Sequence, residues 1–91
     1  MADPIQITAE STPNPNSVKF SLNRVVTSQG SESYDNLEEA TNSPLAKRLL
    51  EVKGVKSLFF LQNFVTVIKD PANGWDEIVP QAKAILKDFF E

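Results

Sequence analysis

The densest group of possible metal ligands in the chain is a set of four carboxylates, Glu32, Asp35, Glu38 and Glu39. Carboxylate oxygens are hard ligands, and such a cluster could hold iron or another hard cation. Acidic residues on a polar segment more often form a solvated charged loop. We therefore treat these four residues as a candidate metal site whose alternative is a solvated loop.

Cysteine and histidine are both absent from the 91 residues. Cysteine thiolates hold iron–sulfur clusters, with histidine as an occasional replacement, so the chain lacks the usual cluster ligands. The absence also excludes the Ser–His and Cys–His pairs of nucleophilic catalysis, and the three glycines form no phosphate-binding loop. We predict that the protein is not an enzyme and binds no cofactor directly.

A group of basic residues offers a second kind of chemistry. Four of the nine basic residues lie near one another: Lys47, Arg48, Lys53 and Lys56. They could dock an acidic partner, and Lys47 and Arg48 are the candidates for that contact. The alternative is a solvated helix face on which Glu51 balances the charge.

Composition narrows the class of protein. Hydrophobic residues make up 41% of the chain and charged residues 23%, as in many soluble domains. The net charge of −3 argues against a nucleic-acid partner, because backbone phosphates favour a basic surface. The start, Met1–Pro4, does not resemble a signal peptide, and no apolar stretch approaches the roughly 20 residues of a membrane span. We expect a cytoplasmic protein with no membrane partner.

The first half of the chain is predicted to hold three strands. Alternation of apolar and polar residues indicates strands near residues 5–10 and 18–22. Two prolines make their connection, Thr12–Asn16, stiff, since each fixes its own φ and restricts the residue before it. Residues 23–42 carry little pattern, and we expect one short edge strand there, at Ser31–Asn36.

The second half begins with a helix and continues with a hairpin. Ser43-Pro44 predicts the helix start, because serine caps helices well and proline suits the first helical position. Gly54 is expected to end this helix. Strands over residues 55–61 and 64–69 then form an antiparallel hairpin, since only Gln62-Asn63 separates them.

Apolar residues at helical spacing from Trp75 to Phe89 predict a second helix. Pro80 is expected to distort it or to mark where its regular part begins, and Trp75 to anchor it in the core. The element order is strand, strand, short strand, helix, strand, strand, helix. This order predicts one α+β domain over residues 1–91, in two layers, with both helices on one face of a mainly antiparallel sheet of four to five strands.

The pairing of the second hairpin predicts an asymmetry between its faces. Because Leu61 should oppose Phe64 across the turn, one face is wholly apolar. That face carries Leu58, Phe60, Val65 and Val67. The other face carries Phe59, Leu61, Phe64 and Ile68, interrupted by Ser57 and Thr66. Helices on one side cannot cover both, so we expect an apolar partner-binding surface; the alternative is that residues 23–42 fold over it.

The Thr12–Asn16 connection also has two interpretations. Its prolines limit the entropy of the unfolded chain, which favours a rigid connector. A pre-ordered loop would also lose little entropy on binding, which would make Asn14 and Asn16 docking residues. The sequence leaves both open.

Several ordered blocks resemble the amino-terminal domain of NifU-like (Nfu) iron–sulfur scaffold proteins. The resemblance runs over most of the chain, from about Ile5 to Phe90. Its blocks are Thr12–Phe20, Ser43–Ala46, Gly54–Ser57, Phe59-Phe60, Phe64–Val67, Trp75-Asp76 and Pro80. Longer family members have a second domain whose Cys-x-x-Cys pair, shared between two subunits, ligates a cluster for delivery to recipient proteins. No residue of this sequence matches those ligands.

The resemblance implies a non-catalytic accessory domain in iron–sulfur cluster assembly or delivery. It would act by protein–protein contacts with Cys-x-x-Cys scaffolds or cluster recipients, and the cluster would lie on the partner. One alternative is a stand-alone interaction module unrelated to iron–sulfur metabolism, because a fold does not fix a function. Another is an iron-binding protein that uses only oxygen ligands.

Overall fold

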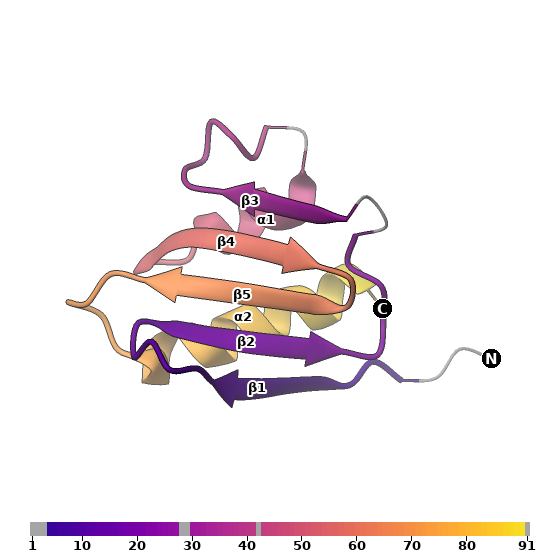
Figure 1. The fold of residues 1–91 in the computed structure, drawn as a ribbon, viewed down its shortest axis with the longest axis horizontal. Coiled ribbons are helices and arrows are strands. Elements are labelled where there is room, and N and C mark those ends of the chain that lie inside the picture. The colour runs from indigo at the N-terminus through magenta and orange to yellow at the C-terminus, as the bar shows by residue number, and fades with distance from the viewer. Residues whose placement is uncertain (1–3, 28–29, 42, 91) are drawn as a thin grey trace.

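The computed structural model describes residues 4–27, 30–41 and 43–90. Its centre is a five-stranded antiparallel sheet with the strand order β1-β2-β5-β4-β3 (Figure 1). The strands are β1 Ile7–Ser11, β2 Ser17–Leu22, β3 Ser31–Tyr34, β4 Val55–Leu61 and β5 Phe64–Lys69. Pairing of β2 with β5 joins the two predicted hairpins at the middle of the sheet.

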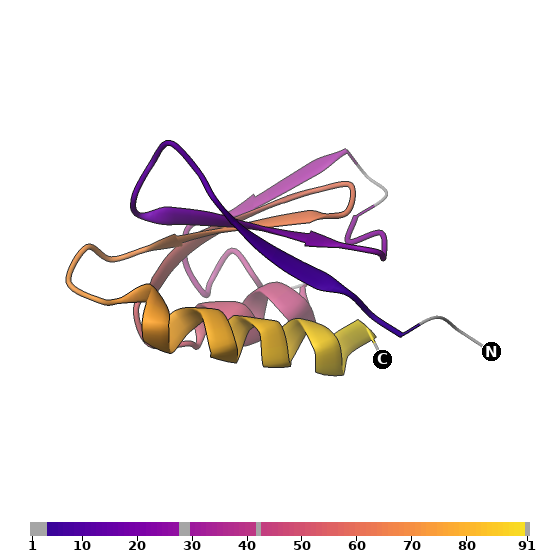
Figure 2. The ribbon, with the colours of Figure 1, turned by 90° about the horizontal axis from the view of Figure 1, so that it is seen from below.

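Two helices lie together on one face of this sheet, as Figure 2 shows. They are α1, Pro44–Leu50, and α2, Trp75–Phe90. The predicted two-layer α+β fold is therefore confirmed. The opposite face of the sheet has no helix over it in the described part of the chain, and we call it the open face.

The core lies between the helices and the sheet. It is built by alternate residues of the inner strands and by one stripe of each helix. Its largest fully buried side chains are Phe20, Phe60, Leu49, Leu58, Ile78, Leu86, Val65 and Val67. Both hairpins thus contribute their predicted apolar face to the same core.

The β4–β5 hairpin has the register that its short turn predicts. Leu61 lies opposite Phe64, and the pairing continues without a shift as far as Ser57 and Ile68. Gln62 takes a left-handed conformation with a φ of 52°. A tight hairpin turn requires such a backbone, which asparagine and glycine adopt more readily than glutamine.

The polar segment 23–42 does contain the predicted edge strand. β3 pairs with β4 and places Tyr34 on the helix side, where its ring lies 5.5 Å from that of Phe60. After β3 the chain turns toward the helix layer, and Ala40 is fully buried in the core. Within this segment, β3 thus extends the sheet, and the residues around Ala40 close one end of the core.

Helix α1 begins where the sequence predicts and ends earlier. The Ser43 side chain accepts a hydrogen bond from the backbone N–H of Ala46, as an N-cap does. The helix ends at Leu50, with Glu51 as the C-cap, so the prediction that Gly54 ends it is wrong. Gly54 instead turns the chain into β4 with a φ of 98°.

Helix α2 begins at Trp75 and continues through Pro80. Proline has no N–H to donate to the preceding turn, but Pro80 is exposed and lies close to the helix start. The buried stripe of α2 is Ile78, Ala82 and Leu86. Trp75 is half-buried and packs against the core at the first residue of the helix, as expected of an anchor, although its ring is not fully enclosed.

Candidate partner-binding face

Strand β4 presents its two faces to very different surroundings. Leu58 and Phe60 point into the core and are 1% and 2% exposed. Phe59 and Leu61, which alternate with them, are 38% and 37% exposed on the open face. The predicted inner face is thus confirmed, and two of the four predicted partner-binding residues are exposed.

Strand β5 adds the other two predicted residues to the same surface. Phe64 and Ile68 are half-buried and lie opposite Leu61 and Ser57. Thr66 lies between them, opposite Phe59. Phe59, Leu61, Phe64 and Ile68 form what we call the hairpin patch. The structure brings these four side chains onto one side of two adjacent strands.

Segment 23–42, in its described part, does not cover the hairpin patch. Residues 23–27 follow the hairpin turn instead, where the backbone N–H groups of Val26 and Thr27 donate to the carbonyl of Gln62 at 2.7 and 3.2 Å. Strand β3 lies beside β4, with Ser33 and Ser31 opposite Phe59 and Leu61. The alternative that this segment folds over the patch is therefore not what the structure shows.

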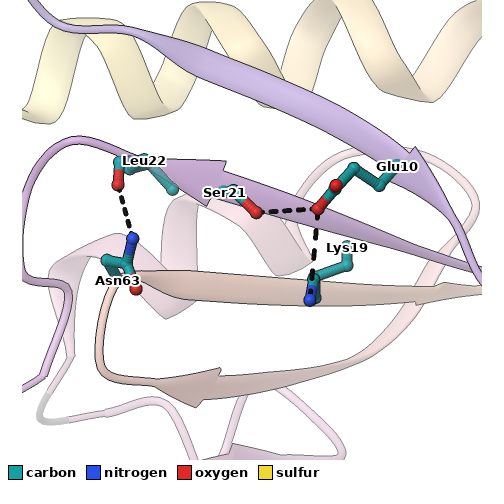
Figure 3. Close-up of polar contacts among 5 residues, drawn as sticks. All are labelled: Glu10, Lys19, Ser21, Leu22 and Asn63. Carbon is teal, nitrogen blue, oxygen red and sulfur yellow. Dashed lines mark hydrogen bonds and ion pairs between the residues drawn. The ribbon is translucent and has the colours of Figure 1, made fainter.

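The β1–β2 half of the open face is polar. The Ser21 hydroxyl donates to a Glu10 carboxylate oxygen at 2.9 Å, and the Lys19 ammonium lies 4.0 Å from the same oxygen (Figure 3). The ammonium also lies 4.2 Å from the centre of the Phe64 ring. Lys19 therefore stands at the boundary between the polar half and the hairpin patch.

The turn end of the hairpin is tied to the end of β2. The Asn63 side-chain amide donates to the carbonyl of Leu22 at 2.8 Å (Figure 3), and the Leu22 N–H donates to the Asn63 carbonyl at 2.9 Å. A shallow hollow of about 500 Å³ lies here, between residues 22–27 and the turn. Asn63 is thus held by backbone contacts that fix the tip of the hairpin.

The Thr12–Asn16 connection uses its polar groups within the fold. The Asn14 side chain accepts from the Asn16 N–H at 2.9 Å, and the Asn16 side chain accepts from the Lys69 ammonium at 3.2 Å. The indole N–H of Trp75 donates to the carbonyl of Pro15 at 3.0 Å. These bonds hold the connection to the end of β5 and the start of α2, which favours the rigid-connector interpretation.

The two predicted basic contact residues lie on α1. Arg48 forms an ion pair of 3.1 Å with Asp88 of α2, which joins the two helices. The expectation that Glu51 balances this group is therefore wrong for Arg48. Lys47 is exposed, and both residues lie in the helix layer, away from the hairpin patch.

The structure does not gather the four candidate metal ligands. Within residues 4–27, 30–41 and 43–90, no three Asp or Glu side chains lie close enough together to hold a metal ion. Glu32 accepts a hydrogen bond from the Tyr34 hydroxyl. Glu39 accepts one from the backbone N–H of Asp35 at 2.6 Å, while Glu38 is exposed. Among the described residues, these contacts direct the carboxylates to separate partners within β3 and the turns that follow it.

Glu32 and Tyr34 affect each other's protonation. Hydrogen bonds from the side chains of Thr27 and Tyr34 stabilise the Glu32 carboxylate and lower its pKa. Burial, followed by the hydrogen bond to Glu32, raises the pKa of the Tyr34 hydroxyl. Around neutral pH the pair is therefore held as carboxylate and neutral hydroxyl, the state that joins these two residues of β3.

This pair predicts a loss of stability in acid. A carboxyl group whose pKa is lowered by folding stabilises the protein above its unfolded pKa, here 4.5, and loses that contribution as the pH falls through the folded value. We expect Glu32→Gln to be less stable than the wild type at pH 7, and the difference to shrink below about pH 4.5. Urea unfolding at several pH values measures this, and a difference independent of pH would contradict it.

The sequence matches a known protein family over most of its length. Residues 7–91 match the family described as scaffold protein Nfu/NifU N terminal. The chain belongs to this Nfu/NifU N-terminal family. The expected resemblance is thereby confirmed over nearly the whole sequence.

In the described part of the chain, no helix is both long enough and apolar enough to cross a membrane.

Named relatives of this Nfu/NifU N-terminal domain are longer proteins. The chain is 39% identical over 84 residues to NifU-like protein 5, mitochondrial, of Arabidopsis thaliana, covering 92% of this chain and 30% of that protein. It is 38% identical over 85 residues to the human NFU1 iron-sulfur cluster scaffold homolog, mitochondrial, covering 92% and 34%. The chain thus spans about a third of the length of these relatives.

Solved structures share the fold. A solution structure of a NifU-like protein from Saccharomyces cerevisiae aligns with a TM-score of 0.82 at 28% identity, covering 92% of this chain and 76% of that one. A crystal structure of a Staphylococcus aureus protein aligns with a TM-score of 0.78 at 28% identity, covering 89% and 98%. Nearly all of that second chain is therefore matched by the fold of this one.

Sequence reasoning missed the polar cluster of Glu10, Lys19 and Ser21. Its signal was present, because Glu10 and Lys19 have opposite charges and flank a short connection. Their pairing depends on the register of β1 on β2, in which Glu10 lies opposite Lys19. The five-residue connection Thr12–Asn16 allows more than one register, whereas the two-residue turn of the second hairpin does not.

Proposed function

We propose that this Nfu/NifU N-terminal domain is a non-catalytic accessory domain in iron–sulfur cluster assembly or delivery. It works by binding a protein that carries cysteine ligands, such as a Cys-x-x-Cys scaffold or a cluster recipient. The cluster lies on that partner, because this chain has neither cysteine nor histidine to hold one. Membership of a scaffold family supports the pathway.

One observation carries the binding role: the hairpin patch is left open. Phe59 and Leu61 keep more than a third of their surface exposed. Contiguous apolar surface of this kind usually marks a protein contact. Aromatic side chains are enriched at the centres of such contacts because they bury a large area with little loss of conformational entropy.

The first test measures binding to a purified Cys-x-x-Cys scaffold from the same organism. Replacing Phe59 and Phe64 by serine should weaken binding at least about tenfold, because both rings leave the contact. Surface plasmon resonance with the scaffold immobilised gives the affinity. Circular dichroism of the variant should match the wild type, since the core face of the hairpin is unchanged.

The matched control lies on the polar half of the same open face. Thr8, exposed on β1 and opposite Ser21, is replaced by alanine and should leave the affinity unchanged. The proposal would be overturned if the wild-type domain bound neither the scaffold nor any of a set of cluster-recipient proteins. Binding unaffected by the double substitution would place the contact elsewhere and contradict the role of the patch.

A further inference from the structure

The boundary of the hairpin patch carries a charge that is only loosely engaged. Lys19 lies 4.0 Å from Glu10, at the outer limit of an ion pair, and its side chain is 40% exposed. The Glu10 oxygen that faces it accepts a shorter hydrogen bond from Ser21, at 2.9 Å. An ammonium has three donors. Lys19 can therefore donate to a further carboxylate without breaking a short bond.

The paired strand positions next to the hairpin patch carry no further charge in the described part of the chain. By alternation and register, its strand positions beside the patch are serine, threonine and apolar residues. The serine and threonine positions are Ser17, Ser21, Thr66, Ser57, Ser31 and Ser33. Apart from Lys56, which lies unpaired at the register shift of β4, Glu10 and Lys19 are the only charged residues at the described strand positions of this face. The Lys19 ammonium, which lies over the Phe64 ring, therefore gives the hairpin patch a preference for a negatively charged partner group.

Covering this surface would strengthen both contacts of Lys19. The attraction between the ammonium and the Phe64 ring increases when water is excluded, and the same holds for an ion pair. A partner that buries Phe59 and Phe64 without supplying a negative charge would instead remove water from the Lys19 ammonium, and no new ion pair would offset that cost. A partner with a lysine or arginine at this point would be repelled.

We propose that the hairpin patch binds a protein segment in which a carboxylate lies beside apolar side chains, and that Lys19 pairs with this carboxylate. The apolar side chains contact Phe59, Leu61 and Phe64. This inference rests on the proposed function for the location of the contact and adds the chemistry of the partner. Lys19 thereby determines which apolar segments are accepted.

The experiment selects short random peptides displayed on phage against the intact wild-type chain. The enriched peptides should combine apolar residues with Asp or Glu, and NMR shifts should place them at Phe59 and Phe64. Lys19→Glu should weaken the best peptide about tenfold, which corresponds to about 1.4 kcal/mol. Lys19→Gln should weaken it less, and Lys19→Arg should retain binding because it keeps the charge.

A charge exchange completes the test. Replacing the peptide carboxylate by lysine should abolish binding to the wild type and restore it to the Lys19→Glu variant. Thr8→Ala serves as the control and should bind the original peptide as the wild type does. Unfolding curves confirm that the Lys19 variants are folded, which is expected for a residue on the surface.

Several results would overturn the inference. Enriched peptides without acidic residues, no selected peptide at the patch, or affinity independent of Lys19 would each do so. Dimerisation of the wild type through Phe59 and Phe64 in sedimentation experiments would make a second copy the occupant. Because the peptides are not iron–sulfur proteins, these results are separate from scaffold binding, whose failure would contradict the proposed function instead.

Discussion

Phe60→Ala is expected to lower the free energy of unfolding by about 3–5 kcal/mol. The Phe60 ring is 2% exposed, lies 5.5 Å from the Tyr34 ring, and fills the space between β4 and the helices. Removing it leaves a cavity that the packed core cannot fully close. Since a small domain has a total stability of about 5–15 kcal/mol, the variant should unfold at much lower urea concentration.

The neighbouring residue provides the control for this substitution. Phe59 has the same side chain on the same strand, yet it is 38% exposed on the open face. Phe59→Ala should therefore cost less, about 1–2 kcal/mol, because part of the ring surface is already in water and no closed cavity is left in the core. Urea unfolding of both variants, followed by circular dichroism, gives the comparison. Equal losses would mean that the hairpin patch is covered in solution.

Gly54→Ala is expected to cost about 3 kcal/mol, the second large effect. Gly54 has a φ of 98°, where an L side chain is strained by about 1–2 kcal/mol. An added Cβ would also lie 2.8 Å from Cβ and Cγ of Asn73 and 3.1 Å from Cδ1 of Ile78. Overpacking of this kind adds about 1–3 kcal/mol. Thermal and urea unfolding measure the loss.

Gly30 separates the two causes. It has a similar φ of 89°, but a Cβ built there meets nothing within 4 Å. Gly30→Ala should therefore show only the backbone cost of about 1–2 kcal/mol. If the two alanine variants were equally stable, contact with Asn73 and Ile78 would not contribute, and the close packing of the turn against the start of α2 would be in doubt.

Local patterns are sufficient to predict most of the fold. The two-residue turn sets the register of β4 on β5, and this register assigns Phe59 and Phe60 to opposite faces of the hairpin. Ser43-Pro44 marks the start of α1, because an N-cap acts within one helical turn. The hairpin patch follows from the same alternation, combined with the expectation that helices cover one face.

Errors arise where contacts join distant parts of the chain. The ion pair between Arg48 and Asp88 depends on how α1 lies against α2, which neither helix specifies alone. The carboxylates near Glu32 are close in sequence, but strand and turn geometry directs them to different partners. Likewise, the indole N–H of Trp75 requires a hydrogen-bond acceptor. The carbonyl of Pro15, which is 60 residues away in the sequence, provides it.

The order of strands in the sheet has a consequence for how the chain folds. Each hairpin is closed by a short connection, which costs little loop entropy and permits fast formation. The central pairing of β2 with β5 joins segments that are far apart along the chain, so its closure costs more. We therefore expect the docking of the two hairpins along this seam to be a late step of folding. Before that step, the edges of β2 and β5 are both open to pairing with other chains.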